Sequence, residues 1–123
     1  MRKTLALLAA AALAATGTSA AAMTSPALID PSSLAGPWAL SSGGKTCHLA
    51  LSVSRAADGR THELDPGDCV EAGFPRLRGW SSEPDGIGFA LDGGQVLFLS
   101  KEEAGRFSGK GRDGRSYVLT RNG

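Results

Sequence analysis

The stretch CHLALSV, residues 47–53, alternates its side chains with a period of two. One face carries the apolar side chains of Cys47, Leu49, Leu51 and Val53. The other face carries His48, Ala50 and Ser52. Because successive side chains of a β-strand point to opposite sides of a sheet, this pattern predicts a half-buried strand. The same period returns at residues 87–91 and 117–121, so we expect a chain built mainly from strands.

Tight turns divide the strand region into short pieces. The dipeptides that mark them are Asp58-Gly59, Asp85-Gly86, Asp92-Gly93 and Asp113-Gly114. Asp-Gly supplies the positive φ angles that two-residue hairpin turns require. Together, the alternation and the turns predict eight strands, near residues 38–41, 47–54, 60–64, 76–81, 86–91, 95–100, 105–110 and 115–121.

Eight short strands favour an all-β fold, a small antiparallel up-and-down β-barrel of the lipocalin or avidin kind. A closed barrel leaves no sheet edge unpaired. A sandwich of two sheets has the same periodicity and is the alternative. In the barrel, we expect the interior to be filled by Leu49, Leu51, Val53, Ile87, Phe89, Leu91, Phe98 and Leu119.

The N-terminus has the three regions of a secretory signal peptide. Arg2 and Lys3 precede an apolar run at residues 5–15, and small residues follow at 16–22. The apolar run is shorter than the roughly 20 residues that a membrane-spanning helix needs. We therefore predict a signal peptide at residues 1–20 and no membrane span.

Cleavage is predicted after Ala20, with a cut after Ala22 as the alternative. Lipoprotein processing requires a cysteine directly after the apolar region, and the first cysteine is Cys47. We therefore expect a periplasmic, or secreted, protein that carries no lipid anchor.

The mature chain divides into a trunk and one barrel domain. The residues directly after Ala20 are uncharged and lack a sustained period, which predicts an extended arm. Asp30 and Pro31 are residue types that cap and begin a short helical turn. We assign residues 21–36 to an N-terminal trunk with a short helix, and residues 37–123 to the barrel.

Two cysteines, Cys47 and Cys69, occur in a chain bound for an oxidising compartment, which predicts a disulfide between them. In the chain-entropy model, a loop of this length contributes about 3 kcal/mol of stability. A zinc site is not expected, because the spacing differs from that of zinc ligands and no further cysteine completes a set.

No motif in the sequence indicates catalysis. The two histidines, His48 and His62, lie at no metal-ligand spacing from another candidate and are expected on the surface. The turn aspartates serve backbone geometry, and no serine lies in a nucleophile elbow. We expect a protein that is not an enzyme and has no cofactor or metal of its own.

The balance of charges also limits the kinds of partner that we expect. The chain has 13 basic and 12 acidic residues, and loss of Arg2 and Lys3 with the signal peptide leaves 11 basic ones. The charges are interspersed, whereas nucleic acid and anionic membranes require a concentrated basic face. We expect neither as a partner, and we expect a monomer.

The strand region opens with Gly36-Pro37-Trp38 and closes near Arg121. In small barrels of this kind, a Gly-x-Trp at the first strand packs its indole across the barrel bottom, and a late Arg or Lys can stack on it. Such a cation–π contact contributes about 0.5–2 kcal/mol. A tryptophan that simply fills the core is the alternative. In both cases Trp38 and Arg121 are predicted to be structural.

Several short segments occur along the chain, and their order is more specific to one protein family than any single segment is. They are Leu34-Ala35-Gly36-Pro37-Trp38, Cys47-His48-Leu49-Ala50-Leu51, Cys69, Trp80, Gly86-Ile87, Gly93-Gly94 and Val118-Leu119-Thr120-Arg121. In this order they resemble the bacterial Inh family, which contains periplasmic inhibitors of serralysin-type alkaline metalloproteinases and a branch of outer-membrane lipoproteins.

The resemblance implies a disulfide-linked eight-stranded barrel whose trunk enters a protease cleft. It also implies the partner, a secreted zinc metalloprotease of the serralysin type, because the terminal amine of those inhibitors reaches the catalytic zinc. The inhibitory trunk would comprise Ala21, Ala22, Met23, Thr24, Ser25 and Pro26. The amine of Ala21 would lie near the zinc of the protease. An α-amine has a pKa of about 7.7–8.0, so it loses its proton readily and can replace the zinc-bound water.

Three alternatives stay open at this point. The barrel could hold a small apolar ligand, although a filled interior argues against this. The protein could inhibit a protease of another class. It could also be a structural protein of the cell envelope that keeps the barrel without the inhibitory trunk.

Overall fold

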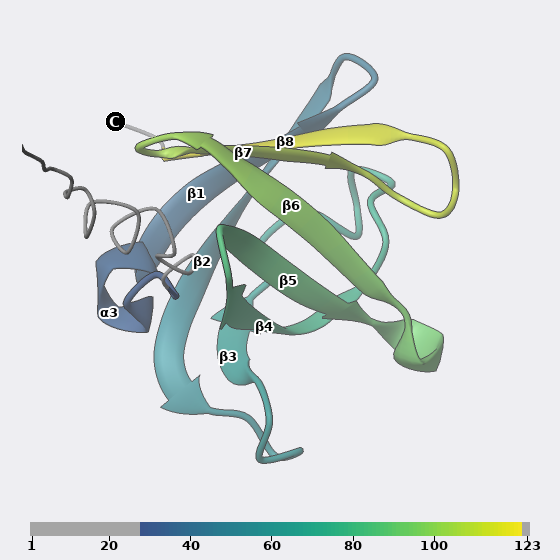
Figure 1. Cartoon of the computed structure of the whole chain (residues 1–123). Coiled ribbons are helices and arrows are strands. Elements are labelled where there is room, and N and C mark those ends of the chain that lie inside the picture. The colour runs from purple at the N-terminus through teal and green to yellow at the C-terminus, as the bar shows by residue number, and fades with distance from the viewer. Residues whose placement is uncertain (1–27, 122–123) are drawn as a thin grey trace, which may run out of the picture.

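The computed structural model describes residues 28–121 of the 123-residue chain, and in it eight antiparallel strands form a closed barrel (Figure 1). The strands are β1 (Gly36–Ser42), β2 (Lys45–Arg55), β3 (His62–Asp65), β4 (Leu77–Glu83), β5 (Gly86–Leu91), β6 (Val96–Glu103), β7 (Arg106–Lys110) and β8 (Ser116–Arg121). The short helix α3 (Pro31–Leu34) precedes β1, and the 3₁₀ turn η2 (Asp92–Gly94) joins β5 to β6. Each strand pairs with its neighbours along the chain. The predicted up-and-down barrel is confirmed, and the sandwich is excluded.

The barrel closes where β1 pairs with β8. Trp38 lies opposite Arg121 and Leu40 lies opposite Leu119 in this pairing. The β1–β2 hairpin turns at Gly43 and Gly44, whose φ angles are 58° and 81°. Glycine adopts this left-handed region without the steric cost of a Cβ atom, so the pair allows the tight reversal.

The β4–β5 turn differs from the expectation for an Asp-Gly pair. The positive φ, 59°, falls on Asp85 and not on Gly86. A side chain at Gly86 is excluded for a different reason, because a Cβ atom there would run into the carbonyl oxygen of Leu99 and the ring of Phe98. This glycine therefore allows β5 and β6 to approach closely.

The observed strands agree with the predicted ones to within a few residues. The largest extension is in β6, which was expected near residues 95–100 and continues through Lys101 to Glu103. Glu102 belongs to this strand and accepts hydrogen bonds from Arg106, at 2.8 Å, and from the hydroxyl of Ser108. Cross-strand pairing with β7 orders these charged residues.

The barrel interior is filled with side chains. Those that are almost completely buried are Trp38, Leu40, Leu49, Leu51, Leu77, Trp80, Ile87, Phe89, Leu97, Leu99, Phe107, Tyr117 and Leu119. They form one continuous core. Burial of a large aliphatic or aromatic side chain contributes about 1.5–3 kcal/mol, so this core is the main source of stability.

Two residues expected in the interior lie outside it. Val53 is 49% exposed. Leu51 pairs with Gly36, the first residue of β1, so β2 extends beyond β1 at Val53 and β1 no longer covers this side chain. Phe98 is 43% exposed, because it lies between two inward-facing leucines and therefore points outward. The prediction for these two residues was wrong.

Chain segments outside the strands cover the two ends of the barrel. At one end, the side chain of Leu34 in α3 is buried against the core. At the other end, Phe74 in the β3–β4 connection is buried and its ring centroid lies 6.4 Å from that of Tyr117. Within residues 28–121, no helix has the length and hydropathy to cross a membrane.

Candidate functional site

The predicted inhibitory trunk, Ala21 to Pro26, lies outside the described residues. What the structure does describe is how the chain directly after the trunk is fixed to the barrel. We call residues 28–35 the anchor segment. In Figure 1 the segment and its helix α3 lie at one end of the barrel, beside the beginning of β1.

The first tie of the anchor segment is to β4 and the turn that follows it. Leu28 forms an isolated antiparallel bridge with Pro84. The hydroxyl of Ser82 donates a hydrogen bond to the carbonyl oxygen of Ile29. The Leu28 side chain is 63% exposed, so the segment lies on the surface at this point and is held through its backbone.

The middle of the anchor segment is the helical turn that the sequence predicted. Asp30 is the N-cap, and its carboxylate accepts hydrogen bonds from the backbone N–H of Ser32 at 3.0 Å and from the hydroxyl of Ser32 at 2.9 Å. Pro31 occupies the first helical position, where its missing N–H costs no hydrogen bond. The turn directs Leu34 into the core.

The second tie is to β1 and β8. The indole N–H of Trp38 donates a hydrogen bond of 2.8 Å to the carbonyl oxygen of Leu34. The guanidinium of Arg121 donates two more, from Nη1 to the carbonyl of Ala35 at 2.8 Å and from Nη2 to that of Ser33 at 2.6 Å. All three carbonyls lie at the end of the helical turn, where backbone oxygens lack helical partners.

The same guanidinium stacks on the Trp38 indole, with Cζ 4.3 Å from the ring centroid. The ring itself is 1% exposed and packs edge-on against Phe107, with centroids 5.8 Å apart. Trp38 therefore both fills the core and forms the cation–π contact, two arrangements that the sequence had left as alternatives.

The two ties are on opposite sides of the barrel. β4 and β8 are four places apart in a ring of eight strands. The anchor segment therefore runs across the barrel end, from Ser82 on one side to Arg121 on the other. Nothing in the local sequence signals the tie to Ser82, which lies 53 residues from Ile29 and is brought there by the closure of the barrel.

A cleft of about 230 Å³ adjoins the anchor segment. It is lined by Ile29, Ser33, Leu34, Trp38, Lys101, Ala104, Gly105, Phe107 and Arg121. The cleft lies between the segment and the β6–β7 turn.

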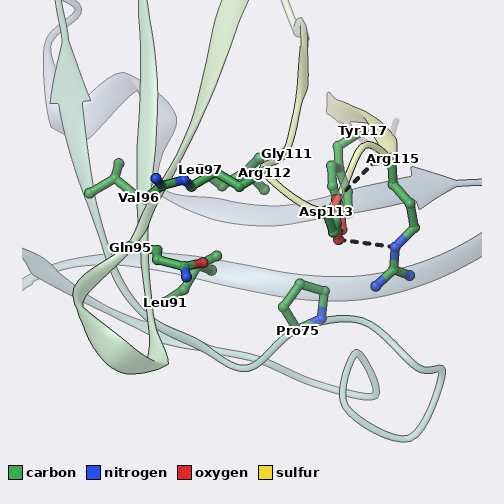
Figure 2. Close-up of a pocket in the computed structure, with 10 residues that line it drawn as sticks. All are labelled: Pro75, Leu91, Gln95, Val96, Leu97, Gly111, Arg112, Asp113, Arg115 and Tyr117. Carbon is green, nitrogen blue, oxygen red and sulfur yellow. Dashed lines mark hydrogen bonds and ion pairs between the residues drawn. The ribbon is translucent and has the colours of Figure 1, made fainter.

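A smaller cleft lies at the opposite end of the barrel, between the η2 turn and the β7–β8 loop (Figure 2). Its volume, about 120 Å³, is below the roughly 150 Å³ of a cavity that holds one benzene molecule. In Figure 2, Asp113 points toward Tyr117 and Arg115. The space is too small for a ligand of the size that lipocalin-like barrels enclose.

The predicted disulfide is confirmed. Cys47 on β2 and Cys69 in the β3–β4 connection are bonded, with Cα atoms 4.8 Å apart. Asp68 lies beside them, and its carboxylate accepts a hydrogen bond of 2.8 Å from the backbone N–H of His48. Within the described chain these two cysteines and Asp68 are the one group with the proximity of metal ligands, but both sulfurs are consumed by the disulfide.

The two histidines differ in environment. His48 is exposed on the outer face of β2, as expected. His62 is half-buried, and its ring centroid lies 4.9 Å from that of Trp80. Its Nδ1 lies 3.1 Å from the carbonyl oxygen of Val53, so its role is in packing β3 against β2 and β4. His62 therefore lies at the surface, as expected, but its neighbours cover part of the ring.

Comparison with known proteins gives matches of two kinds, to a family and to solved structures. The sequence model of the family described as "Protease inhibitor Inh" matches residues 28–121. The crystal structure of a psychrophilic marine protease MP inhibitor superposes with a TM-score of 0.59 and 27% sequence identity, over 76% of this chain and 100% of that chain. No curated protein sequence matches at a significant level. The family match covers the entire described barrel, and the chain therefore belongs to the Inh family of protease inhibitors.

Proposed function

We propose that this protein inhibits a secreted zinc metalloprotease of the serralysin type by inserting its N-terminal arm into the active-site cleft. The observation that carries the proposal is the anchor segment. It is tied to opposite sides of the barrel at Ser82 and Arg121, so the arm that precedes Leu28 starts from a fixed point. A fixed starting point is what an inhibitor needs in order to deliver a short peptide to a defined depth.

The arm has suitable length and chemistry for this task. Cleavage after Ala20 leaves seven residues ahead of Leu28, and seven extended residues span at most about 23 Å. These residues are uncharged, so the arm enters a cleft without burying an unpaired charge. The terminal amine would then be the sole ionisable group at its tip, and in its neutral form it can bind zinc in place of the nucleophilic water.

The predicted signal peptide places the encounter in the periplasm or outside the cell, where a secreted protease from the same cell would meet the inhibitor. Binding there would protect the producing cell from a protease that is active before its release. The family membership supports a protease as the partner. The resemblance to inhibitors of serralysin-type proteases, together with the uncharged arm, supports a zinc enzyme in particular.

The alternative of a small-ligand barrel is disfavoured by a specific observation. The interior positions that would surround a ligand are occupied by side chains of the core, which include the almost completely buried rings of Trp38, Trp80, Phe89 and Phe107. Barrels of eight strands have interiors that side chains alone can fill.

The test compares three forms of the mature protein that begins at Ala21. One is unmodified, one is acetylated at the terminal amine, and one lacks residues 21–25. Inhibition constants are measured against serralysin-type, cysteine and serine proteases side by side, and circular dichroism establishes that each form is folded.

We expect the unmodified form to inhibit the zinc protease, the acetylated form to be weaker by about a hundredfold, and the truncated form to be inactive. Loss of one coordinate interaction of about 3 kcal/mol corresponds to that factor. Equal inhibition by all three forms would reject the arm mechanism. Selective inhibition of a serine or cysteine protease would instead establish the alternative target class.

A further inference from the structure

We infer that Arg121 is a positioning residue for inhibition, because its guanidinium holds the anchor segment from which the arm starts. The inference rests on the proposed function and adds to it a residue at the opposite end of the sequence. Arg121 is the last residue of β8, and its hydrogen bonds reach back 86 and 88 residues to Ala35 and Ser33.

The geometry restricts the guanidinium on several sides. Its two terminal nitrogens donate to different carbonyls of the anchor segment, and its plane lies over the Trp38 ring. Gly36 leaves the space that it occupies, since a Cβ atom at Gly36 would lie 3.3 Å from Nη1. The backbone N–H of Arg121 is itself fixed by a 2.8 Å hydrogen bond to the carbonyl of Gly105. The planar guanidinium, held in this way, fixes the position of the helical turn relative to β8.

The barrel core depends little on this charge. Trp38 is already buried and bonded to Leu34 through its own N–H, and the pairing of Leu40 with Leu119 continues the β1–β8 ladder below it. What depends on the guanidinium is the path of residues 33–35. Loss of Arg121 therefore loosens the anchor segment at residues 33–35 more than it affects the fold of the barrel.

The position of the anchor segment matters because a zinc–nitrogen bond is only about 2.0–2.1 Å long. A shift of the anchor segment by more than this distance, passed on to the terminal amine, would be enough to prevent coordination. Ser82 limits the same motion from the other side of the barrel, through its hydrogen bond to Ile29.

The test measures inhibition of a serralysin-type protease by Arg121→Ala, Arg121→Lys and Ser82→Ala, each with a free and with an acetylated terminal amine. The matched control is Arg115→Ala. Arg115 is also an arginine over an aromatic ring, 5.9 Å from the centroid of Tyr117, but it lies at the far end of the barrel. Inhibition is assayed well below the melting temperature of each variant.

With the free amine, we expect Arg121→Ala to weaken inhibition at least tenfold, mainly through faster dissociation. Arg121→Lys should recover part of the loss, since an ammonium keeps the charge without the planar fork, and Ser82→Ala should lose a smaller factor. Arg115→Ala should stay within twofold of the unaltered protein. With the acetylated amine, the effect of Arg121→Ala should shrink to threefold or less.

Retention of full inhibition by folded Arg121→Ala would overturn the inference. So would an undiminished effect after acetylation, because Arg121 would then act independently of the amine. If Arg121→Ala does not fold, Arg121→Lys and Ser82→Ala decide the question by the same criteria. A failure of the proposed function is distinguished by the unaltered protein, whose inhibition would then be insensitive to acetylation.

Discussion

The phenol oxygen of Tyr117 donates a hydrogen bond of 2.7 Å to Oδ2 of Asp113, which links the buried start of β8 to the loop before it. Burial and the neighbouring carboxylate raise the pKa of Tyr117 to about 12. The same hydrogen bond is the main cause of a lowered pKa at Asp113, with a contribution from the backbone N–H of Arg115. The link is therefore strongest when the phenol is protonated and the carboxylate is ionised.

This relationship predicts a loss of stability at high pH. Between pH 10 and 12 the unfolded chain has released the Tyr117 proton while the folded chain keeps it, so unfolding is favoured as the pH rises. We expect the free energy of unfolding to fall more steeply across this range in the unaltered protein than in Tyr117→Phe. Urea titrations at half-unit pH steps measure the two slopes, and parallel slopes would contradict the prediction.

Removal of the disulfide should lower stability without abolishing the fold. The double variant Cys47→Ser, Cys69→Ser loses about 3 kcal/mol, because the unfolded chain is no longer closed into a 22-residue loop. Each kcal/mol corresponds to a decrease of about 4–8 °C in the Tm of a domain of this size. Differential scanning calorimetry measures the change. Alkylation with mass spectrometry provides the check on the unaltered protein, where detection of free thiols would refute the disulfide.

Trp38→Ala should be severely destabilising, by about 3–5 kcal/mol, because it removes a large buried ring from the core. Arg121→Ala should cost much less, of the order of the 0.5–2 kcal/mol typical of a cation–π contact. Chemical denaturation gives both values, and Trp38→Phe provides a milder variant if Trp38→Ala is unfolded. If Trp38→Ala kept full stability yet lost inhibition, the structural assignment of Trp38 would be wrong.

Two glycines with similar backbone angles should differ in their tolerance of a side chain. Gly59 has a φ of 71° and open space around it, so Gly59→Ala should cost only the strain of a left-handed alanine, about 1–2 kcal/mol. At Gly67, with a φ of 57°, a Cβ atom would also press into the carbonyl of His48. We expect Gly67→Ala to be less stable than Gly59→Ala by about 1–3 kcal/mol. Equal unfolding midpoints would show that the loop at Gly67 can move away.

Much of the fold could be predicted because alternation is a local property. A period of two identifies a strand from its own residues, and tight turns between strands leave antiparallel neighbours as the simplest arrangement. The wrong predictions concern side chains whose burial depends on the neighbouring strands and not only on the alternation within their own strand. Val53 continues the alternation of Leu51 in the sequence. In the structure β2 extends past β1 there, and its register with β3 shifts between Leu51 and Arg55, so the Val53 side chain is left exposed.

The choice of inward face at β6 shows a second limit. Val96, Phe98 and Ser100 form one alternating set, while Leu97 and Leu99 form the other, and both contain bulky apolar residues. The pairing of β6 with β5 decides between them, since Leu97 and Leu99 lie opposite the inward-facing Phe89 and Ile87. Phe98 lies opposite Gly88 on the outer face instead.

The sequence by itself determined the number of strands, the disulfide and the helical turn that Asp30 caps, since each of these depends on neighbouring residues or on a unique pair of cysteines. It favoured a barrel over a sandwich, and the pairing of β1 with β8 in the tertiary structure decided between them. Only the tertiary structure decided how the anchor segment is held. Its ties to Ser82 and Arg121 join residues 53 to 88 positions apart, and they exist because closure of the barrel brings β4 and β8 to opposite sides of one end. Hydrogen bonds between a side chain and a distant backbone carbonyl leave no periodic trace in a sequence, because any residue can supply the carbonyl.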